Sequence, residues 1–355
     1  MPIQNTHAIV CTILGTALGD ALGLPYEGLS PQRAARMLGE PDRFRFVFGK
    51  GMISDDTEHT CLVAQSLIAA GPDSVTFSRE LARRMRWWLL GVPAGIGFAT
   101  LRSILKLWMG FSPARSGVYS AGNGPAMRSA VLGAAIEDSQ QLQQLVRAST
   151  RITHTDPKAE YAALAVAVAA RIAARQQTLP GEQLLAELRS LLPDDPPASE
   201  LLRLLEQAAA SAARGDTTVT FAAELGRARG VSGYAYHSVP VSIHAALRHA
   251  NDFRAAVQGA IRCGGDADTI AAITGGIVGA AVGKAGLPAE WLNRLCEWPR
   301  TVIWMERLGE QLASSLQTNS RQRPLRTPAL GILARNFLFA AIVLFHGFRR
   351  LLPPY

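Results

Sequence analysis

The chain has 355 residues, of which 48% are hydrophobic and 18% charged, and its formal net charge is +8. This length allows one large domain or two ordinary ones with a substantial core, and the composition excludes disorder throughout. Residues 316–355 contain six arginines and no acid, so the rest of the chain is nearly neutral and predicts no nucleic-acid partner.

Most of the chain is predicted to be helical, because apolar residues recur at helical spacing and alanine is abundant. The predicted helices are Ala8–Leu22, Glu58–Ala70, Phe77–Leu90, Gly95–Leu107, Ala126–Ile136, Ser139–Thr150, Ala159–Ala174, Gln183–Leu192, Ser199–Ala212, Val241–Ala250, Phe253–Arg262 and Thr269–Lys284. Strand signals are nearly absent, and the best candidate is a weak one at Phe44–Phe48. We therefore predict one all-helical domain over residues 1–315 and a separate tail over residues 316–355.

The beginning of the chain and its cysteines predict a cytoplasmic location. The apolar segment Ile9–Leu24 has no lysine or arginine before it and contains Asp20, which argues against a signal peptide. The four cysteines are scattered, and no pair has the spacing of a metal site or a redox motif. Reduced thiols in the cytoplasm are the simplest interpretation.

Two acidic clusters carry the strongest functional signal in the sequence. The first is Ser54-Asp55-Asp56-Thr57, and the second is Asp266-Ala267-Asp268-Thr269 behind a pair of glycines. Each places carboxylates and hydroxyls beside apolar segments, where uncompensated charge is costly. A set of oxygen ligands without His or Cys suits Mg²⁺ or Mn²⁺. If the fold brings the clusters together, they could hold two ions roughly 4 Å apart. The alternative for either cluster alone is an ordinary helix cap.

The predicted helix Thr269–Lys284 is unusually poor in side-chain bulk. Gly275, Gly276, Gly279 and Ala280 allow a neighbouring backbone to approach closely. The run is too short to cross a membrane, so we predict a buried central helix whose N-terminus, capped by Asp268 or Thr269, faces the second acidic cluster.

Together with other motifs, these clusters resemble the ADP-ribosylglycohydrolase family. The resemblance extends through Gly15-Thr16-Ala17-Leu18-Gly19-Asp20-Ala21-Leu22-Gly23, Gly122-Asn123-Gly124-Pro125-Ala126-Met127-Arg128 and Thr153-His154-Thr155-Asp156-Pro157, and covers roughly residues 8 to 285. It implies an all-α, orthogonally packed helical bundle with a binuclear Mg²⁺ or Mn²⁺ site in a cleft. The implied metal ligands are Ser54, Asp55, Asp56, Asp266, Asp268 and Thr269.

The same resemblance assigns the substrate and catalytic residues. Glu27 would lie near the metals, and Asp55 or Asp56 would accept the proton of the attacking water. The substrate-binding residues would be Gly122, Asn123, Gly124, Met127 and His154, with the glycine loop on the diphosphate or distal ribose. Tyr234 is added to this set for its aromatic ring and not from the resemblance. Arg128 could contact phosphate or be structural, and Tyr234 and Tyr236 could stack on adenine or belong to the core.

The function implied is a metal-dependent hydrolase that releases ADP-ribose from modified protein side chains, with an arginine N-glycosidic linkage favoured. Serine-linked, polymeric or small-molecule ADP-ribose conjugates are alternative substrates, and a non-catalytic structural member of the family is the alternative of another class.

The tail predicts a contact of its own. Residues Ala329–Gly347 are apolar apart from Arg335, Asn336 and His346, and basic residues flank the run. This composition is typical of a helix that lies on an anionic membrane surface, which would make the protein peripheral at the inner face. A helix that packs back onto the body or onto a second subunit is the alternative.

Overall fold

The computed structural model describes residues 6–352, and over this range the chain is helical with no strand. The first helices are α1 (Thr6–Gly23), the 3-10 helix η1 (Leu24–Tyr26), α2 (Pro31–Leu38), α3 (Asp55–Ala70), α4 (Ser74–Leu90), α5 (Phe98–Trp108) and α6 (Pro113–Ser116). They are followed by α7 (Gly124–Met127), α8 (Ala130–Ala135), α9 (Ser139–Arg151), α10 (Pro157–Gln176), α11 (Gly181–Leu191), α12 (Pro196–Arg214) and α13 (Thr218–Glu224). The last are α14 (Ala235–Arg248), α15 (Phe253–Ile261), α16 (Ala267–Gly286), α17 (Ala289–Arg294), α18 (Val302–Gln317) and α19 (Ala329–Arg349).

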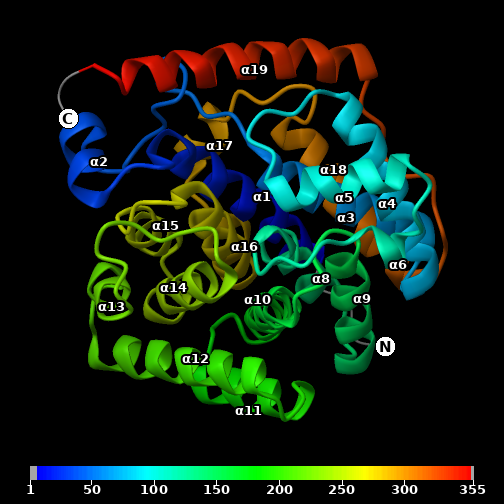
Figure 1. Ribbon diagram of the computed structural model, residues 1–355, viewed down its shortest axis with the longest axis horizontal. Helices are drawn as coiled ribbons and strands as arrows, with labels where there is room; N and C mark the ends of the chain where they lie inside the picture. Colours follow the sequence, from blue (N-terminus) through cyan, green and yellow to red (C-terminus); the bar gives the residue numbers. More distant parts are fainter. Residues whose placement is uncertain (1–5, 353–355) are drawn as a thin grey trace.

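The prediction of an all-helical bundle is confirmed, with shifts at the helix ends. Helices α1, α10 and α16 lie at the centre, and α11 and α12 lie on the opposite side of them from α19 (Figure 1). Five α-helices, α2, α6, α13, α17 and α18, and the 3-10 helix η1 lie outside the predicted ranges. The predicted boundary at residue 315 falls in the last turn of α18.

Two predicted elements differ from the structure. The helix expected over Ala126–Ile136 is broken into α7 and α8 at Arg128 and Ser129, which lie between the two. The strand expected over Phe44–Phe48 does not form, and Val47 makes only an isolated bridge with Lys50. Two of the three alternating phenylalanines are buried against helices instead. The ring centroid of Phe44 lies 6.5 Å from that of Trp291, and the ring centroid of Phe46 lies 5.2 Å from that of Phe339, whereas Phe48 is fully exposed.

The central helices α1 and α16 pack backbone against backbone, as the glycines of α16 predict. A Cβ atom added to Gly15 or Gly19 of α1 would overlap the backbone of Gly275 or Ala271 in α16. A Cβ on Gly23 would lie 2.6 Å from the carbonyl oxygen of Ala267. Because these glycines place no side chains between the two helices, the C-terminal half of α1 lies directly beside the start of α16.

The substitution Gly19→Ala is expected to destabilise the fold by roughly 1–3 kcal/mol, because the added methyl group can be placed only by moving the two helices apart. The same substitution at Gly347 of α19 meets no atom within 4 Å and is expected to stabilise slightly, by about 0.5–1 kcal/mol. Urea unfolding of the two variants measures both signs. Equal unfolding free energies would contradict the close packing of α1 on α16.

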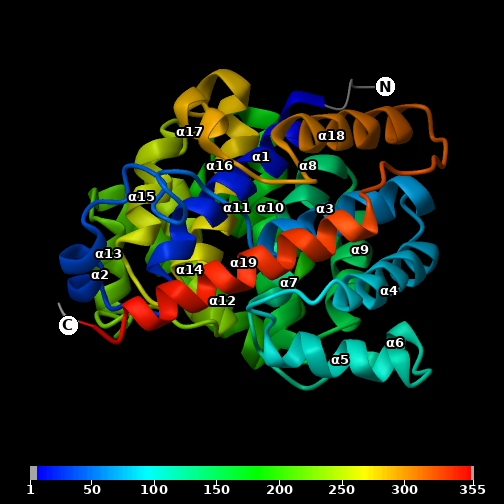
Figure 2. The ribbon, with the colours of Figure 1, turned by 90° about the horizontal axis from the view of Figure 1, so that it is seen from above.

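Helix α19 lies along the outside of the body (Figure 2). Its inner face carries the buried residues Arg335, Asn336 and Phe339, while Leu330, Phe337, Leu338, Leu344, Phe345 and Phe348 on the rest of its surface are exposed. Three described helices are long and apolar enough to cross a membrane, and two of them, α1 and α16, are largely buried in the core. The third is α19, of which only 28% of the apolar window is buried.

Candidate active site

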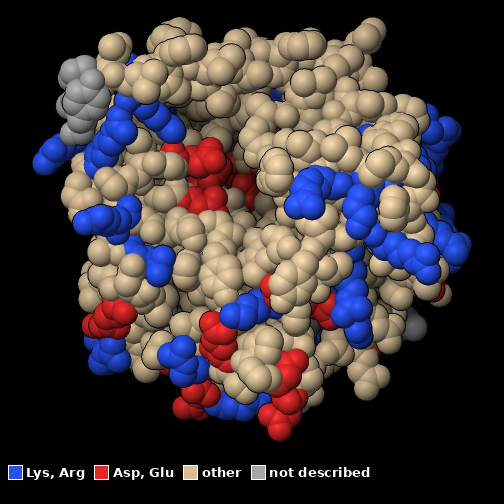
Figure 3. All heavy atoms as spheres, in the orientation of Figure 1, with Lys and Arg blue, Asp and Glu red and all other residues tan. Residues whose placement is uncertain are grey.

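A cavity of about 380 Å³ opens on one face, and ten of the thirteen predicted site residues line it. These ten are Glu27, Asp55, Gly122, Asn123, Gly124, Met127, His154, Asp266, Asp268 and Thr269. Acidic side chains gather in a hollow below α19 in the view of Figure 3. The two clusters, more than two hundred residues apart in the sequence, therefore meet in one cleft.

The first cluster is held by the start of α3. Ser54 is the N-cap of this helix, and its Oγ accepts a hydrogen bond from the amide of Asp56 and donates one to Asp56 Oδ2 at 3.1 Å. Asp55, on the first turn, faces the cavity. Asp56 is buried behind the cavity wall and also accepts a hydrogen bond from Thr269 Oγ1 of α16 at 3.3 Å. Ser54, Asp56 and Thr269 thus join the two clusters.

Asp20 of α1 orients this cluster, a role that was not predicted for it. Its carboxylate is completely buried and accepts hydrogen bonds from the amide of Ser54 and from the amide and hydroxyl of Thr57. Burial raises the pKa of Asp20 to about 6, and the bonds from Thr57 and Ser54 oppose that rise. The signal in the sequence was an aspartate inside an otherwise apolar, glycine-rich helix.

The second cluster lies at the start of α16. The preceding Gly264 and Gly265 adopt positive φ, and a Cβ on Gly265 would overlap the backbone of Val231. The helix begins one residue before the predicted cap, with Asp266 at the N-cap position, so neither Asp268 nor Thr269 is the cap. The side chain of Asp266 makes no cap bond and accepts a hydrogen bond from Asn123 Nδ2 at 2.6 Å instead.

The cleft concentrates more negative charge than its own side chains can neutralise. The pKa values of Asp55, Asp56 and Asp268 are all raised well above the usual range, first by burial and then by neighbouring carboxylates. Asp56 Oδ1 and Asp268 Oδ1 are buried and have no hydrogen-bond partner. Buried oxygens that lack a donor are the chemistry that a hard cation would satisfy.

No three His, Cys, Asp or Glu side chains between residues 6 and 352 already stand in the arrangement that holds one ion. The fit to a metal therefore depends on the unpaired oxygens of Asp56 and Asp268 and on the crowding of carboxylates, with the hydroxyls of Ser54 and Thr269 beside them. These are the residues that could hold Mg²⁺ or Mn²⁺.

A glycine loop and a histidine form the neighbouring wall. A Cβ on Gly122 would lie 3.0 Å from His154 Nε2, and one on Gly124 would lie 3.2 Å from His154 Cε1. Glycine at both positions therefore lets the loop pass directly over the imidazole. Burial, with the nearby charge of Arg128, lowers the pKa of His154 to about 3, so the ring is neutral at pH 7. The helix that follows the loop, α7, is a single turn, so its dipole adds little to anion binding.

Arg128, Tyr234 and Glu27 lie at three different positions: behind the glycine loop, outside the cavity lining and at the cavity opening. Arg128 is completely buried and donates hydrogen bonds to the carbonyl groups of Gly124 and Ser149, so it supports the loop from behind. Tyr234 does not line the cavity; its hydroxyl accepts a hydrogen bond from Lys158. Glu27 lies at the opening, where desolvation and the charge of Asp266 raise its pKa and Arg350 opposes the rise.

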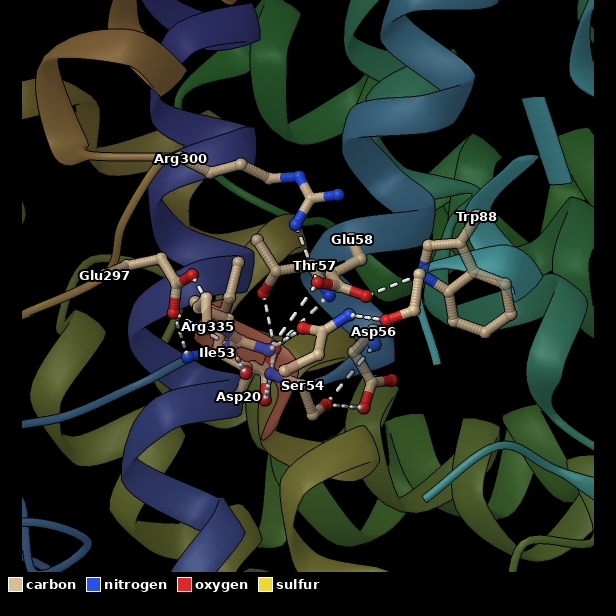
Figure 4. A network of polar contacts seen from close by, with 12 residues as sticks. Asp20, Ile53, Ser54, Asp56, Thr57, Glu58, Trp88, Glu297, Arg300 and Arg335 are labelled. Carbon is tan, nitrogen blue, oxygen red and sulfur yellow. Dashed lines mark hydrogen bonds and ion pairs between the residues drawn. The ribbon is translucent and has the colours of Figure 1, made fainter. Parts of the chain in front are cut away.

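Behind the first cluster lies a buried ionic network that the sequence does not predict. Glu58 of α3 pairs with Arg300 at 2.6 Å and accepts a hydrogen bond from Trp88 at 2.5 Å. Glu297 pairs with Arg335 of α19 at 2.8 Å. Figure 4 shows how the two pairs meet beside Ile53 and Ser54. Only the polar Arg335-Asn336 pair inside an apolar run hinted at such a contact.

Comparison with known proteins identifies relatives along most of the chain. The family model described as ADP-ribosylglycohydrolase matches residues 4–322. A protein of Archaeoglobus fulgidus described as uncharacterized is 35% identical over 291 residues, 80% of this chain and 90% of its own. ADP-ribosylhydrolase ARH3 of Gallus gallus is 27% identical, with 80% and 88% of the two chains covered.

Two further matches agree with these. The ADP-ribosyl-[dinitrogen reductase] glycohydrolase of Rhodospirillum rubrum is 26% identical, with 79% of this chain and 88% of its own covered. A solved structure titled ADP-ribosylglycohydrolase-related protein complex superimposes with a TM-score of 0.66 at 28% identity, over 88% of this chain and 99% of that one.

Proposed function

The chain belongs to the ADP-ribosylglycohydrolase family of glycosidic-bond hydrolases, and we propose that it uses two Mg²⁺ or Mn²⁺ ions to release ADP-ribose from modified protein side chains. Hydrolysis of ADP-ribose conjugates follows from the family. The observation that carries the metal dependence is the pair of buried, unpartnered oxygens on Asp56 and Asp268, one from each acidic cluster.

The residues that would hold the ions are those of the two clusters: Ser54, Asp55, Asp56, Asp266, Asp268 and Thr269. Bound there, the ions would lower the pKa of a water molecule and hold the ribose hydroxyls next to the bond that breaks. The raised pKa values of Asp55, Asp56 and Asp268 support this assignment, because cations would relieve the repulsion that raises them.

In the proposed reaction, the oxygen of water bonds to the anomeric carbon as the bond to the side chain breaks, and the leaving atom takes up a proton. Asp55 accepts the proton of the water, because it faces the cavity whereas Asp56 is held by Ser54 and Thr269. Glu27, whose pKa is raised at the opening, supplies the proton to the departing group.

The loop Gly122-Asn123-Gly124 holds the diphosphate or distal ribose, and Met127 and the neutral His154 complete that wall. We favour an arginine N-glycosidic linkage. The name of the Rhodospirillum rubrum relative describes release of ADP-ribose from a protein, which supports a protein side chain as the substrate.

Release of free ADP-ribose tests this function. The full chain is incubated with arginine-, serine- and acid-linked ADP-ribosyl proteins, with Mg²⁺, with Mn²⁺ and with a chelator. Turnover of the arginine conjugate that requires metal is the expected result. Turnover of the serine conjugate alone would overturn the linkage, and activity in chelator would overturn the metal dependence. No turnover of any conjugate would favour the structural alternative.

We also propose that the protein is cytoplasmic and peripheral at the inner face of the membrane, with α19 lying on the anionic lipid surface. The outer residues Leu330, Phe337, Phe345 and Phe348 are each at least 65% exposed, and together they make an apolar face without an acid. Arginines flank both ends of the helix, so the charge complements anionic lipid rather than a second basic copy of the chain.

A triple variant tests the surface: Phe337→Gln, Leu344→Gln and Phe348→Gln in the full chain. We expect it to bind vesicles of mixed anionic and zwitterionic lipid at least tenfold more weakly than the wild type, because three of the six exposed large apolar side chains of α19 become polar. The control is Val219→Gln, an exposed apolar residue on α13. Equal co-sedimentation of all three proteins, or a dimer that hides α19, would contradict the proposal.

A further inference from the structure

The strongest unexplained feature is a tail arginine buried behind the acidic clusters. Arg335 lies in α19, beyond the residues matched by the family model, yet it is only 5% exposed. Arg335 Nε donates to Glu297 Oε1 at 2.9 Å and Nη2 donates to Glu297 Oε2 at 2.8 Å. A bidentate pair of this kind fixes the direction of both side chains as well as their separation.

The Arg335–Glu297 pair forms hydrogen bonds with the backbone immediately before the first cluster. Arg335 Nη2 donates to the carbonyl oxygen of Ile53, and Glu297 Oε2 accepts a hydrogen bond from the amide of Ile53 at 3.2 Å. Both polar backbone atoms of Ile53 are thus bound by side chains of the pair. The next amide, that of Ser54, is bound by Asp20. The extended entry to α3 is therefore held from two sides, by α1 and by α19 (Figure 4).

The network is also balanced in charge. Arg335 lies 3.6 Å from Glu58, which is paired with Arg300, so two buried glutamates face two buried arginines. Asn336 fixes the same turn of α19 by donating to the carbonyl oxygen of Gly91 at 2.7 Å. Loss of Arg335 would leave Glu297 buried without its cation and close to the acidic clusters, where a further negative charge is unfavourable.

We propose that Arg335 is a positioning residue, through which α19 holds Ile53 and with it the Ser54–Asp56 segment of the active site. Its catalytic consequence depends on the proposed function, whereas its structural consequence does not. Helix α19 therefore contributes to the active site of the helical domain. Its polar inner face positions the site, whereas its apolar outer face makes the proposed membrane contact.

Amide hydrogen exchange of the full-length protein tests the positioning directly. Arg335→Met is expected to raise exchange at least tenfold in peptides that cover residues 51–57, while peptides from α10 stay unchanged. Leu338→Ser, on the exposed side of the same helix, is the matched control and is expected to exchange like the wild type. Wild-type exchange at residues 51–57 in a folded Arg335→Met protein would overturn the proposal.

Two further variants address a failure of Arg335→Met to fold and separate the charge of Arg335 from its geometry. If Arg335→Met does not fold, the double variant Arg335→Met/Glu297→Gln removes both charges of the pair and is expected to fold with the same increase in exchange. Arg335→Lys keeps the charge but lacks the planar fork, and is expected to rescue the exchange only in part. Full rescue by lysine would show that charge alone suffices and would overturn the geometric part of the proposal.

Steady-state kinetics test the catalytic consequence of losing Arg335. In Arg335→Met we expect kcat to fall at least tenfold with little change in KM, because the substrate wall of Gly122, Gly124 and His154 is on other elements. An unchanged kcat would refute the catalytic consequence. If the wild type itself turns over no ADP-ribosyl substrate, the proposed function fails while the exchange result still decides the role of Arg335.

Discussion

Asp268→Asn is expected to stabilise the metal-free protein at pH 7.5 and to abolish turnover, although the two side chains have nearly the same shape. Asp268 is 5% exposed, and its Oδ1 has no partner. Burial raises its pKa most, and the charges of Glu27, Asp266 and Asp56 add to the rise. Removing one ionisable carboxyl from this group relieves repulsion, so the free energy of unfolding of the metal-free protein rises.

The same change removes a proposed metal ligand. We expect kcat/KM to fall by at least about 100-fold, because even the outer-shell partners of a metal cost up to that factor. Thermal melting with and without Mg²⁺ separates the two effects: Mg²⁺ raises the Tm of the wild type and leaves that of the variant unchanged. A metal-free variant less stable than the wild type would contradict the crowding of charge in the cleft.

The pH dependence of the wild type has a defined sign. The folded protein binds protons on Asp55, Asp56 and Asp268 more tightly than the unfolded chain, because their pKa values are raised in the fold. Without metal, the free energy of unfolding therefore falls as the pH rises above about 4 through these raised values. Asp268→Asn is expected to flatten that decline, which urea unfolding at several pH values measures.

Asp20→Asn, unlike Asp268→Asn, is expected to lower the free energy of unfolding. The carboxylate of Asp20 receives hydrogen bonds from the amides of Ser54 and Thr57 and from the Thr57 hydroxyl, so it acts only as an acceptor. An asparagine must turn its amide group toward one of these donors, which leaves a buried N–H without an acceptor. The free energy of unfolding should fall by roughly 1–3 kcal/mol, and turnover should be lost because Ser54 and Asp55 shift.

Asp73→Asn is the matched control. Asp73 is the N-cap of α4 and accepts a hydrogen bond from the amide of Thr76. Asparagine caps a helix about as well as aspartate, so this variant should unfold like the wild type. Circular dichroism during urea unfolding compares the three proteins. Stability of Asp20→Asn equal to that of the wild type would remove Asp20 from the role of orienting the first cluster.

Much of the fold could be predicted from local sequence. Helical spacing of apolar residues, with few strand signals, identified the long helices, and the small residues of α16 indicated its close packing. Short helices such as α6 and α13 were missed because one or two turns carry too few residues for a clear period. Phe44–Phe48 was misread because two alternating phenylalanines pack on Trp291 and Phe339 from separate helices, a contact that looks like strand alternation in the sequence.

The chain's own sequence determined the chemistry of the cleft: acidic and hydroxyl residues without His or Cys, a glycine loop and His154, in the order of a known family. Only the tertiary structure decided which carboxylates face the cavity, that Asp20 is the acceptor behind Ser54, and that Arg335 from the tail hydrogen-bonds Ile53. These partners are far apart along the chain, and the bonds between them depend on where helices cross. Residue type sets what a side chain can bind, but burial and proximity set what it does bind.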